Sequence, residues 1–180
     1  MLFRVRDLLA KTTHELHLEL EAGSGGRGRR IRVPEAQRPG LSLAGYLKSQ
    51  ASSRILVIGK VEMEYLRDLD PATRRERLQA LMKASVPAVI VTRRYRPPRE
   101  LVELCEELPV PLLRTPLPTM EFLSKLTIFL HDQFAPKQTM HATLVEVFGI
   151  GVLLQGDSAV GKSETALGLI ERGHRLISDD

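Results

Sequence analysis

The sequence predicts an α/β protein in two parts, and two observations carry this prediction. Short apolar runs alternate with helix-like segments between positions 54 and 134. Further on, residues 156–163 read Gly-Asp-Ser-Ala-Val-Gly-Lys-Ser, between an apolar run and a segment with an apolar helical face. The first pattern predicts a parallel sheet covered by helices, and the second predicts a strand, a phosphate-binding loop (P-loop) and a helix. We therefore expect an N-terminal parallel-sheet α/β domain over residues 1–134 and the beginning of a P-loop nucleotide-binding domain over residues 135–180.

The elements of the first part follow from this alternation. Residues 17–21 alternate like a strand, and the glycine-rich residues 23–28 read as a turn, because no strand-to-helix context surrounds them. Buried strands are expected over residues 54–58, 87–92 and 110–113, and helices over residues 70–84, 98–107 and 120–134. Asp70 and Pro71 are typical of an N-cap followed by a first-turn proline, and they open the first of these helices.

The helix expected over residues 120–134 has an apolar stripe that predicts a core-facing side. Its members are Met120, Leu123, Leu126, Leu130 and Phe134. Packing between subunits is the alternative interpretation of the same stripe.

Residues 135–139 read as a linker, and the second part follows it. We expect a strand over residues 141–148, a turn at Gly149 and a strand over residues 151–155. The helix after the glycine motif should end near Gly173, a natural C-cap residue, and residues 175–178 return as a strand.

Asp179 and Asp180 follow that last strand. In a parallel α/β sheet, ligands lie outside the carboxyl ends of the strands, so these two carboxylates are expected near the phosphates. One would hold Mg²⁺ and one would accept a proton from an attacking hydroxyl or water. A solvated acidic pair without a chemical role is the alternative.

The motif itself predicts binding of a nucleoside triphosphate. Its glycines permit a sharp turn, so that backbone N–H groups surround the phosphates. The cradle consists of Gly156, Asp157, Ser158, Ala159, Val160, Gly161, Lys162 and Ser163. The Lys162 ammonium would neutralise charge on the outer phosphates, and the Ser163 hydroxyl would bind the Mg²⁺ that bridges them.

Composition narrows the classes of protein and partner. The chain is 43% hydrophobic and 27% charged, without an apolar run long enough to span a membrane. Its first residues do not resemble a signal peptide. The single cysteine, Cys105, fits a reducing cytoplasm, and we interpret it as a packing residue. These features predict a cytoplasmic protein without a membrane partner.

Two arginine clusters stand out against a formal net charge of only +4. The first comprises Arg27, Arg29, Arg30 and Arg32, and the second comprises Arg93, Arg94, Arg96 and Arg99. Nucleic-acid binding is disfavoured, because aromatic residues make up 4% of the chain and Trp is absent, which leaves few stacking surfaces. Solvated loops are the favoured interpretation, and an acidic or phosphorylated partner is an alternative for the second cluster.

Taken together, these segments resemble the bacterial HPr kinase/phosphorylase family. Met140 and His141, the motif with its continuation to Leu167, and residues 172–180 resemble the start of that family's catalytic domain. The segments that resemble its N-terminal domain are residues 38–45, 89–92, 112–116 and 135–136. The resemblance covers essentially the whole chain.

The resemblance implies an activity that the motif alone does not. Family members use ATP and Mg²⁺ to phosphorylate a seryl hydroxyl of HPr, the phosphocarrier of the sugar phosphotransferase system, and so regulate sugar uptake and carbon metabolism. They reverse the reaction with inorganic phosphate and release pyrophosphate. HPr or a paralogous phosphocarrier is the implied partner, and a homohexamer is the implied assembly.

The resemblance also implies roles for residues. Lys162 and the motif bind ATP, Ser163 binds Mg²⁺, and Asp180 takes the seryl proton and returns one in the reverse direction. His141 matches the family's active-site histidine, although a lone histidine is more often structural. Ala142 departs from the glycine that usually follows that histidine.

Family members continue well beyond the position of Asp180, so we expect this chain to be the N-terminal portion of a longer protein. A nucleotide- or metabolite-binding regulatory module without turnover is the alternative function. A nucleic-acid-associated NTPase is a third hypothesis, which the modest charge and the few aromatic residues disfavour.

Overall fold

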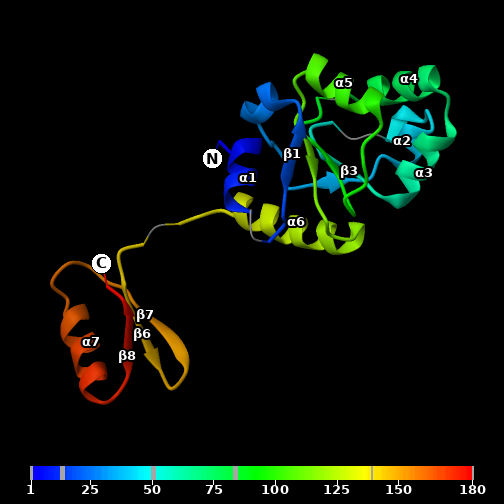
Figure 1. The fold of residues 1–180 in the computed structure, drawn as a ribbon. Helices are drawn as coiled ribbons and strands as arrows, with labels where there is room; N and C mark the ends of the chain where they lie inside the picture. The colour runs from blue at the N-terminus through cyan, green and yellow to red at the C-terminus, as the bar shows by residue number, and fades with distance from the viewer. Residues whose placement is uncertain (1, 13–14, 50–51, 83–84, 139, 180) are drawn as a thin grey trace. The chain divides into compact units, whose positions relative to one another are not determined.

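The computed structural model describes residues 2–12, 15–49, 52–82, 85–138 and 140–179. The chain divides into two compact units, Met1–Ala135 and Pro136–Asp180. Each unit has a sheet of its own (Figure 1). No helix in the described ranges is long and apolar enough to cross a membrane.

The first unit is built on a sheet with the strand order β1-β5-β4-β3-β2. Its strands are β1 (Glu19–Ala22), β2 (Ala36–Gln37), β3 (Ile55–Ile58), β4 (Val89–Val91) and β5 (Leu112–Arg114). β2 to β5 run parallel to one another, which confirms the predicted parallel α/β architecture. β1 is antiparallel to β5, with Leu20 opposite Leu113.

Helices cover both faces of this sheet. They are α1 (Val5–Lys11), α2 (Gly40–Leu43), α3 (Lys60–Asp68), α4 (Pro71–Met82), α5 (Arg99–Glu107) and α6 (Thr119–Phe134), with 3₁₀ turns η1 (Ser24–Gly28) and η2 (Leu47–Ser49). The crossovers between neighbouring parallel strands pass through α2, α3, α4 and α5. Because such crossovers are right-handed, these helices share one face. Figure 1 shows α4 and α5 on the side of the sheet opposite α6.

The core of the first unit has two halves that share the same strands. Ile55 and Val57 of β3 pack in one cluster with α1 and α6. Leu56 and Ile58 pack in the other cluster, with α3, α4 and α5. Successive side chains of a strand face opposite sides, and here both sides are covered. This is why the strands appear in the sequence as continuous apolar runs.

The first turn of α4 matches its predicted cap. The N–H groups of Ala72 and Thr73 each donate to Asp70 Oδ1 over 3.0 Å. Hydrogen bonds from Thr73 lower the pKa of the Asp70 carboxyl below its usual value. The helix reaches Met82, and the predicted end at residue 84 lies outside the described residues.

The buried side of α6 contains the stripe that we predicted except for its first member. Met120 is 68% exposed, so its placement in the core is wrong. Phe122, Leu126 and Leu130 are fully buried, at a spacing of four residues. The half-buried members of the predicted stripe are Leu123 and Phe134. The row that faces the sheet therefore shares Leu126 and Leu130 with the predicted stripe and begins at Phe122 instead of Met120.

The second unit contains β6 (Thr143–Val147), β7 (Ile150–Leu154), α7 (Lys162–Glu171) and β8 (Arg175–Ser178). Its sheet has the order β7-β6-β8, and both pairs are antiparallel. The β6–β7 pair agrees with the predicted turn at Gly149, whereas the parallel sheet that we assumed in placing Asp179 and Asp180 was wrong. Phe148 and Gly149, with φ of 51° and 80°, form a two-residue turn between β6 and β7. Such a short connection joins antiparallel strands.

Candidate functional site

The predicted glycine motif forms a loop between β7 and the start of α7. We call residues 156–163 the glycine loop. Gly161 has φ of 91° and is the N-cap of α7, whose Thr165 N–H donates to the Gly161 carbonyl over 2.9 Å. A Cβ at Gly156 would come within 2.9 Å of the Val160 side chain. Glycines at these two positions therefore permit the tight path of the loop into the helix.

The loop lies at the N-terminus of a ten-residue helix. Backbone N–H groups without helical partners and the positive end of the helix dipole together favour an anion at such a place. Asp157, Ser158, Ala159 and Val160 are all exposed, so this backbone is open to solvent. The arrangement suits an oxyanion such as phosphate.

Lys162 is the first residue of α7 and reaches back over the loop. Its ammonium donates to the carbonyls of Gly156, at 2.8 Å, and Asp157, at 2.9 Å. Ser163 is the next residue, exposed in the first turn of the helix. The structure thus brings a cation and a hydroxyl to the same end of the helix as the loop.

The antiparallel pairing still brings the predicted acidic end of β8 to the same side as the loop. β7 and β8 both run opposite to β6, so their carboxyl ends lie at the end of the sheet where β6 begins. Asp179 follows β8, and the hydroxyl of Thr143, the first residue of β6, donates to Asp179 Oδ1 over 2.6 Å. Asp180 lies outside the described residues.

His141 lies two residues before β6 and is exposed. Because Thr143 pairs with Leu154, His141 and Gly156 both extend beyond the same end of the sheet. The start of β6, the end of β7 and the end of β8 therefore meet there. Among the residues that the structure describes, no group of three His, Cys, Asp or Glu side chains is arranged to hold a metal ion.

Thr143 is the polar residue at this end that the sequence did not single out. It is buried, with 2% of its surface exposed, and its partner is 36 positions away. A threonine at the start of an apolar strand carries no local signal for such a contact. Only the register of β6 against β8 places the two side chains together.

Family models match nearly the whole chain. The description "HPr Serine kinase N terminus" matches residues 3–130, and "HPr Serine kinase C-terminal domain" matches residues 132–180.

Two relatives named HPr kinase/phosphorylase align with this sequence. The protein from Bacillus pumilus (strain SAFR-032) is 41% identical over 177 residues, which are 98% of this chain and 56% of that protein. The one from Brevibacillus brevis (strain 47 / JCM 6285 / NBRC 100599) is 42% identical over 164 residues, which are 91% of this chain and 53% of that protein. The chain thus spans about half the length of these relatives.

A solved structure with a distant likeness contains the CBS and DRTGG domains of the regulatory region of Clostridium perfringens pyrophosphatase, complexed with the activator diadenosine tetraphosphate. The likeness has a TM-score of 0.47 at 16% identity, over 68% of this chain and 46% of that one. The two family models account for both units described above, and the chain therefore belongs to the HPr serine kinase family.

Proposed function

We propose that this chain takes part in the ATP- and Mg²⁺-dependent phosphorylation of a seryl hydroxyl on HPr and in its reversal by phosphorolysis. The observation that carries the proposal is the glycine loop at the N-terminus of α7, with Lys162 folded over it, in a chain of this family. Its cellular role would be to regulate sugar uptake and carbon metabolism in the cytoplasm.

The glycine loop is the proposed nucleotide site. Backbone N–H groups from Gly156 to Ser163 would bind the phosphates of ATP, because they lie at a helix N-terminus. The Lys162 ammonium would exchange its bonds to loop carbonyls for phosphate oxygens. Ser163 would hold the Mg²⁺ from the first turn of the helix. When bound, ATP supplies the transferable phosphoryl group, and Mg²⁺ neutralises charge on it.

Proton transfer is assigned to the end of β8. Asp180 would accept the proton of the attacking seryl hydroxyl and would return one when inorganic phosphate attacks phosphoserine. Asp179 is held by Thr143 and would fix the direction in which the chain leaves the strand. His141 would act at the same end of the sheet, within reach of a group bound at the loop.

The proposed partners are HPr or a paralogous phosphocarrier, together with inorganic phosphate and pyrophosphate. The proposed assembly is a homohexamer. We do not expect a nucleic acid or a membrane among the partners.

Phosphate transfer from labelled ATP to purified HPr with Mg²⁺ tests the proposal, with Lys162→Ala as the matched variant. We expect ATP to raise the midpoint of thermal unfolding of the unchanged chain and not that of Lys162→Ala, because only the former keeps the phosphate-binding cation. Circular dichroism should show the same fold in both. Equal protection of the two proteins by ATP would refute the nucleotide site.

The alternative is a nucleotide-binding regulatory module without turnover. The observation in its favour is that the chain spans about half the length of its relatives. Protection by ATP without transfer to HPr would select this alternative. Transfer that is lost in Lys162→Ala would select the enzyme.

A further inference from the structure

A pocket with a volume of about 340 Å³ lies in the first unit, at the amino ends of β3 and β4. The residues that line it include Arg29, Arg30, Arg32, Ser53, Ser85 and Pro87. We call it the arginine pocket, since three arginines and no acidic residue line it. This end of the sheet is opposite to the one where parallel α/β proteins usually bind ligands.

The backbone that carries the arginines is held in an extended conformation. The N–H of Val5 donates to the Arg29 carbonyl over 3.1 Å, and the N–H of Ile31 donates to the Phe3 carbonyl over 3.0 Å. Arg4 and Arg30 form an antiparallel bridge between these bonds. The arginine side chains therefore start from fixed positions, which reduces the entropy lost when they bind a ligand.

Arg29 is anchored on one side of the pocket. Its Nε donates to the Val86 carbonyl over 3.1 Å, and its Nη1 lies 3.5 Å from the carbonyls of Leu108 and Pro109. Carbonyl oxygens satisfy these donors without neutralising the charge. The anchored guanidinium thus contributes a fixed positive charge to the pocket wall.

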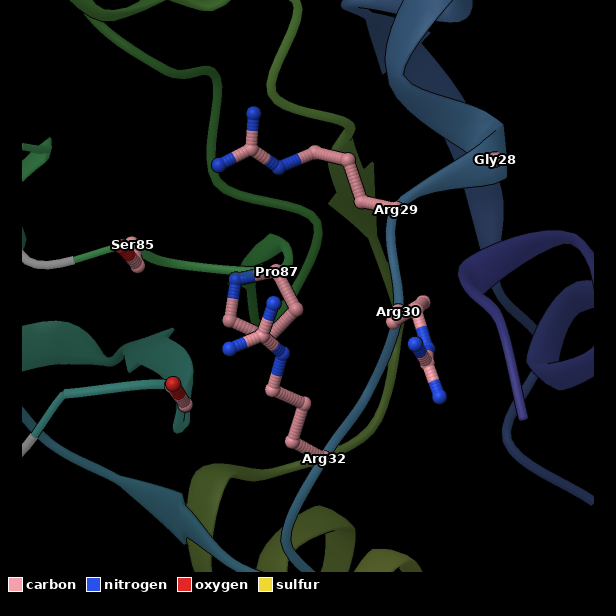
Figure 2. A pocket seen from close by; sticks show the side chains of 7 residues that line it. Gly28, Arg29, Arg30, Arg32, Ser85 and Pro87 are labelled. Carbon is pink, nitrogen blue, oxygen red and sulfur yellow. The ribbon is translucent and has the colours of Figure 1, made fainter. Parts of the chain in front are cut away.

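The side chains of Arg30 and Arg32 are not anchored by hydrogen bonds as the side chain of Arg29 is. Within the described ranges, neither side chain has a hydrogen bond or an ion pair. Glu35, the acidic residue that follows in the same segment, is paired with Arg54. Figure 2 shows Arg32 pointing toward Pro87 and Arg29 extending to the same side of the segment, whereas Arg30 points away from Pro87.

A second cavity adjoins the first through shared residues. It has a volume of about 210 Å³ and is lined by Arg30 and Arg32 together with Phe3, Ile31 and Phe134. Charged and aromatic walls thus lie next to each other. An anionic head in the arginine pocket would have an apolar surface beside it.

We propose that the arginine pocket binds a phosphate dianion, either free or as the terminal group of a small phosphate monoester. Guanidinium groups match phosphate oxygens in geometry and charge. The volume is near the lower end of the range for ligand pockets, roughly 300–1,000 Å³, which favours a small molecule. The site lies in a different unit from the glycine loop and does not rest on the function proposed above.

Residue-resolved NMR titration tests the proposal. The probes are glycerol 3-phosphate and inorganic phosphate, and glycerol is the uncharged control compound. We expect saturable shifts of the backbone signals of residues 28–32 and 85–87 with both anions and none with glycerol. The anion that binds more tightly identifies the source of the phosphate. Signals of residues 156–163 report the glycine loop separately, so the two sites succeed or fail independently.

Substitutions distinguish a built site from a basic surface. Arg32→Ala should weaken binding about tenfold or more, because charge-assisted hydrogen bonds are lost. Arg27→Ala removes the same charge from the same segment outside the pocket, and it should change the affinity about twofold or less.

Two results would overturn the proposal. One is the absence of shifts at residues 28–32 up to about 10 mM of either anion. The other is equal weakening by Arg27→Ala and by Arg32→Ala, which would indicate a general basic surface. Tight, steeply salt-dependent binding of an oligonucleotide that Arg27→Ala also weakens would be further evidence for that surface.

Discussion

Gly23 occupies a left-handed turn between β1 and η1, with φ of 69°. A Cβ there would overlap the Val110 carbonyl and would lie 2.9 Å from the Cys105 carbonyl. Backbone atoms cannot move aside as a flexible side chain can. We expect Gly23→Ala to lower the free energy of unfolding by about 2 kcal/mol or more, from strain and overlap together.

Gly25→Ala is the matched control, because its Cβ would meet only Pro109 Cβ at 3.7 Å, an ordinary contact. Its effect should be within about 0.5 kcal/mol. Chemical denaturation of both variants measures the difference. Similar losses in the two variants would contradict the role assigned to Gly23.

Cys105 is fully buried in α5, which confirms its interpretation as a packing residue. Burial, with a smaller contribution from the charge of Glu106, raises the pKa of the Cys105 thiol to about 12 from its ordinary value of 9.0. Between these values the unfolded chain releases the thiol proton and the folded chain keeps it. The free energy of unfolding should therefore fall as the pH rises through this range.

We expect the unchanged chain to lose about 1 kcal/mol more stability than Cys105→Ala between about pH 8 and about pH 10. Urea unfolding at the two pH values measures both losses. Identical losses would show that the thiol ionises equally in both states. In the folded chain, the same burial should keep Cys105 unreactive toward thiol reagents at neutral pH.

The residues of the glycine loop could be named from the sequence because the motif is local and contiguous. The hydrogen bond between Thr143 and Asp179 could not, because it depends on pairing between strands far apart in the chain. The same holds for the arginine pocket, where Ser53 and Ser85 come from two separate loops.

At the scale of elements, α6 shows what determines the buried side of a helix. Leu126 and Leu130 are common to the predicted stripe and to the buried row, and the two differ in whether the row begins at Met120 or at Phe122, both apolar. Periodicity alone did not choose between them, since the stripe is broad. The sheet determines which side of α6 is buried, because the face of the sheet that α6 covers accommodates the ring of Phe122 among Ile55, Val57 and Ile90.

Two substitutions on this one helix test that assignment. Phe122→Ala should cost about 3–5 kcal/mol of stability, because it leaves a cavity in the core. Met120→Ala should cost less than about 0.5 kcal/mol, since Met120 is exposed. Thermal or urea unfolding of both variants provides the comparison, and a reversal of the two costs would mean that Met120, and not Phe122, lies on the buried side.

Strand positions were largely predictable, and strand partners were not. Runs such as Ile55–Ile58 are apolar throughout, because both of their faces are covered. The antiparallel edge strand β1 and the antiparallel sheet of the second unit arise from pairing and turn geometry. The turn at Phe148 and Gly149 lacks the usual Asn-Gly signal, but the glycine was enough to predict a turn there.

Considered as a whole, the molecule distributes its buried apolar side chains unevenly. The first unit has two core clusters. In the described part of the second unit, the buried apolar residues are Ala142, Val145 and Ala166. Its exposed apolar residues are Met140, Phe148, Ile150, Leu153, Val160, Leu167, Ile170, Leu176 and Ile177. A unit of this size with so small a core is marginally stable.

Native-state hydrogen exchange should therefore separate the two units. We expect the amides of β3 and β4 to be protected by orders of magnitude more than those of β6 and β8, because protection follows local stability. Mass spectrometry of peptides from each strand measures this. Equal protection in the two sheets would show that the second unit is as stable as the first.

The two sheets also differ in the edges that they offer to other chains. In the first unit, β2 is only two residues long, and β1 carries Glu21 in an ion pair with Arg114. Short or charged edges resist the addition of a further strand. In the second unit both edge strands, β7 and β8, are exposed and carry apolar residues, among them Ile150 and Ile177. Self-association of this chain at high concentration should therefore begin at the second sheet, and a lysine placed at Ile150 or Ile177 would act as a gatekeeper against it.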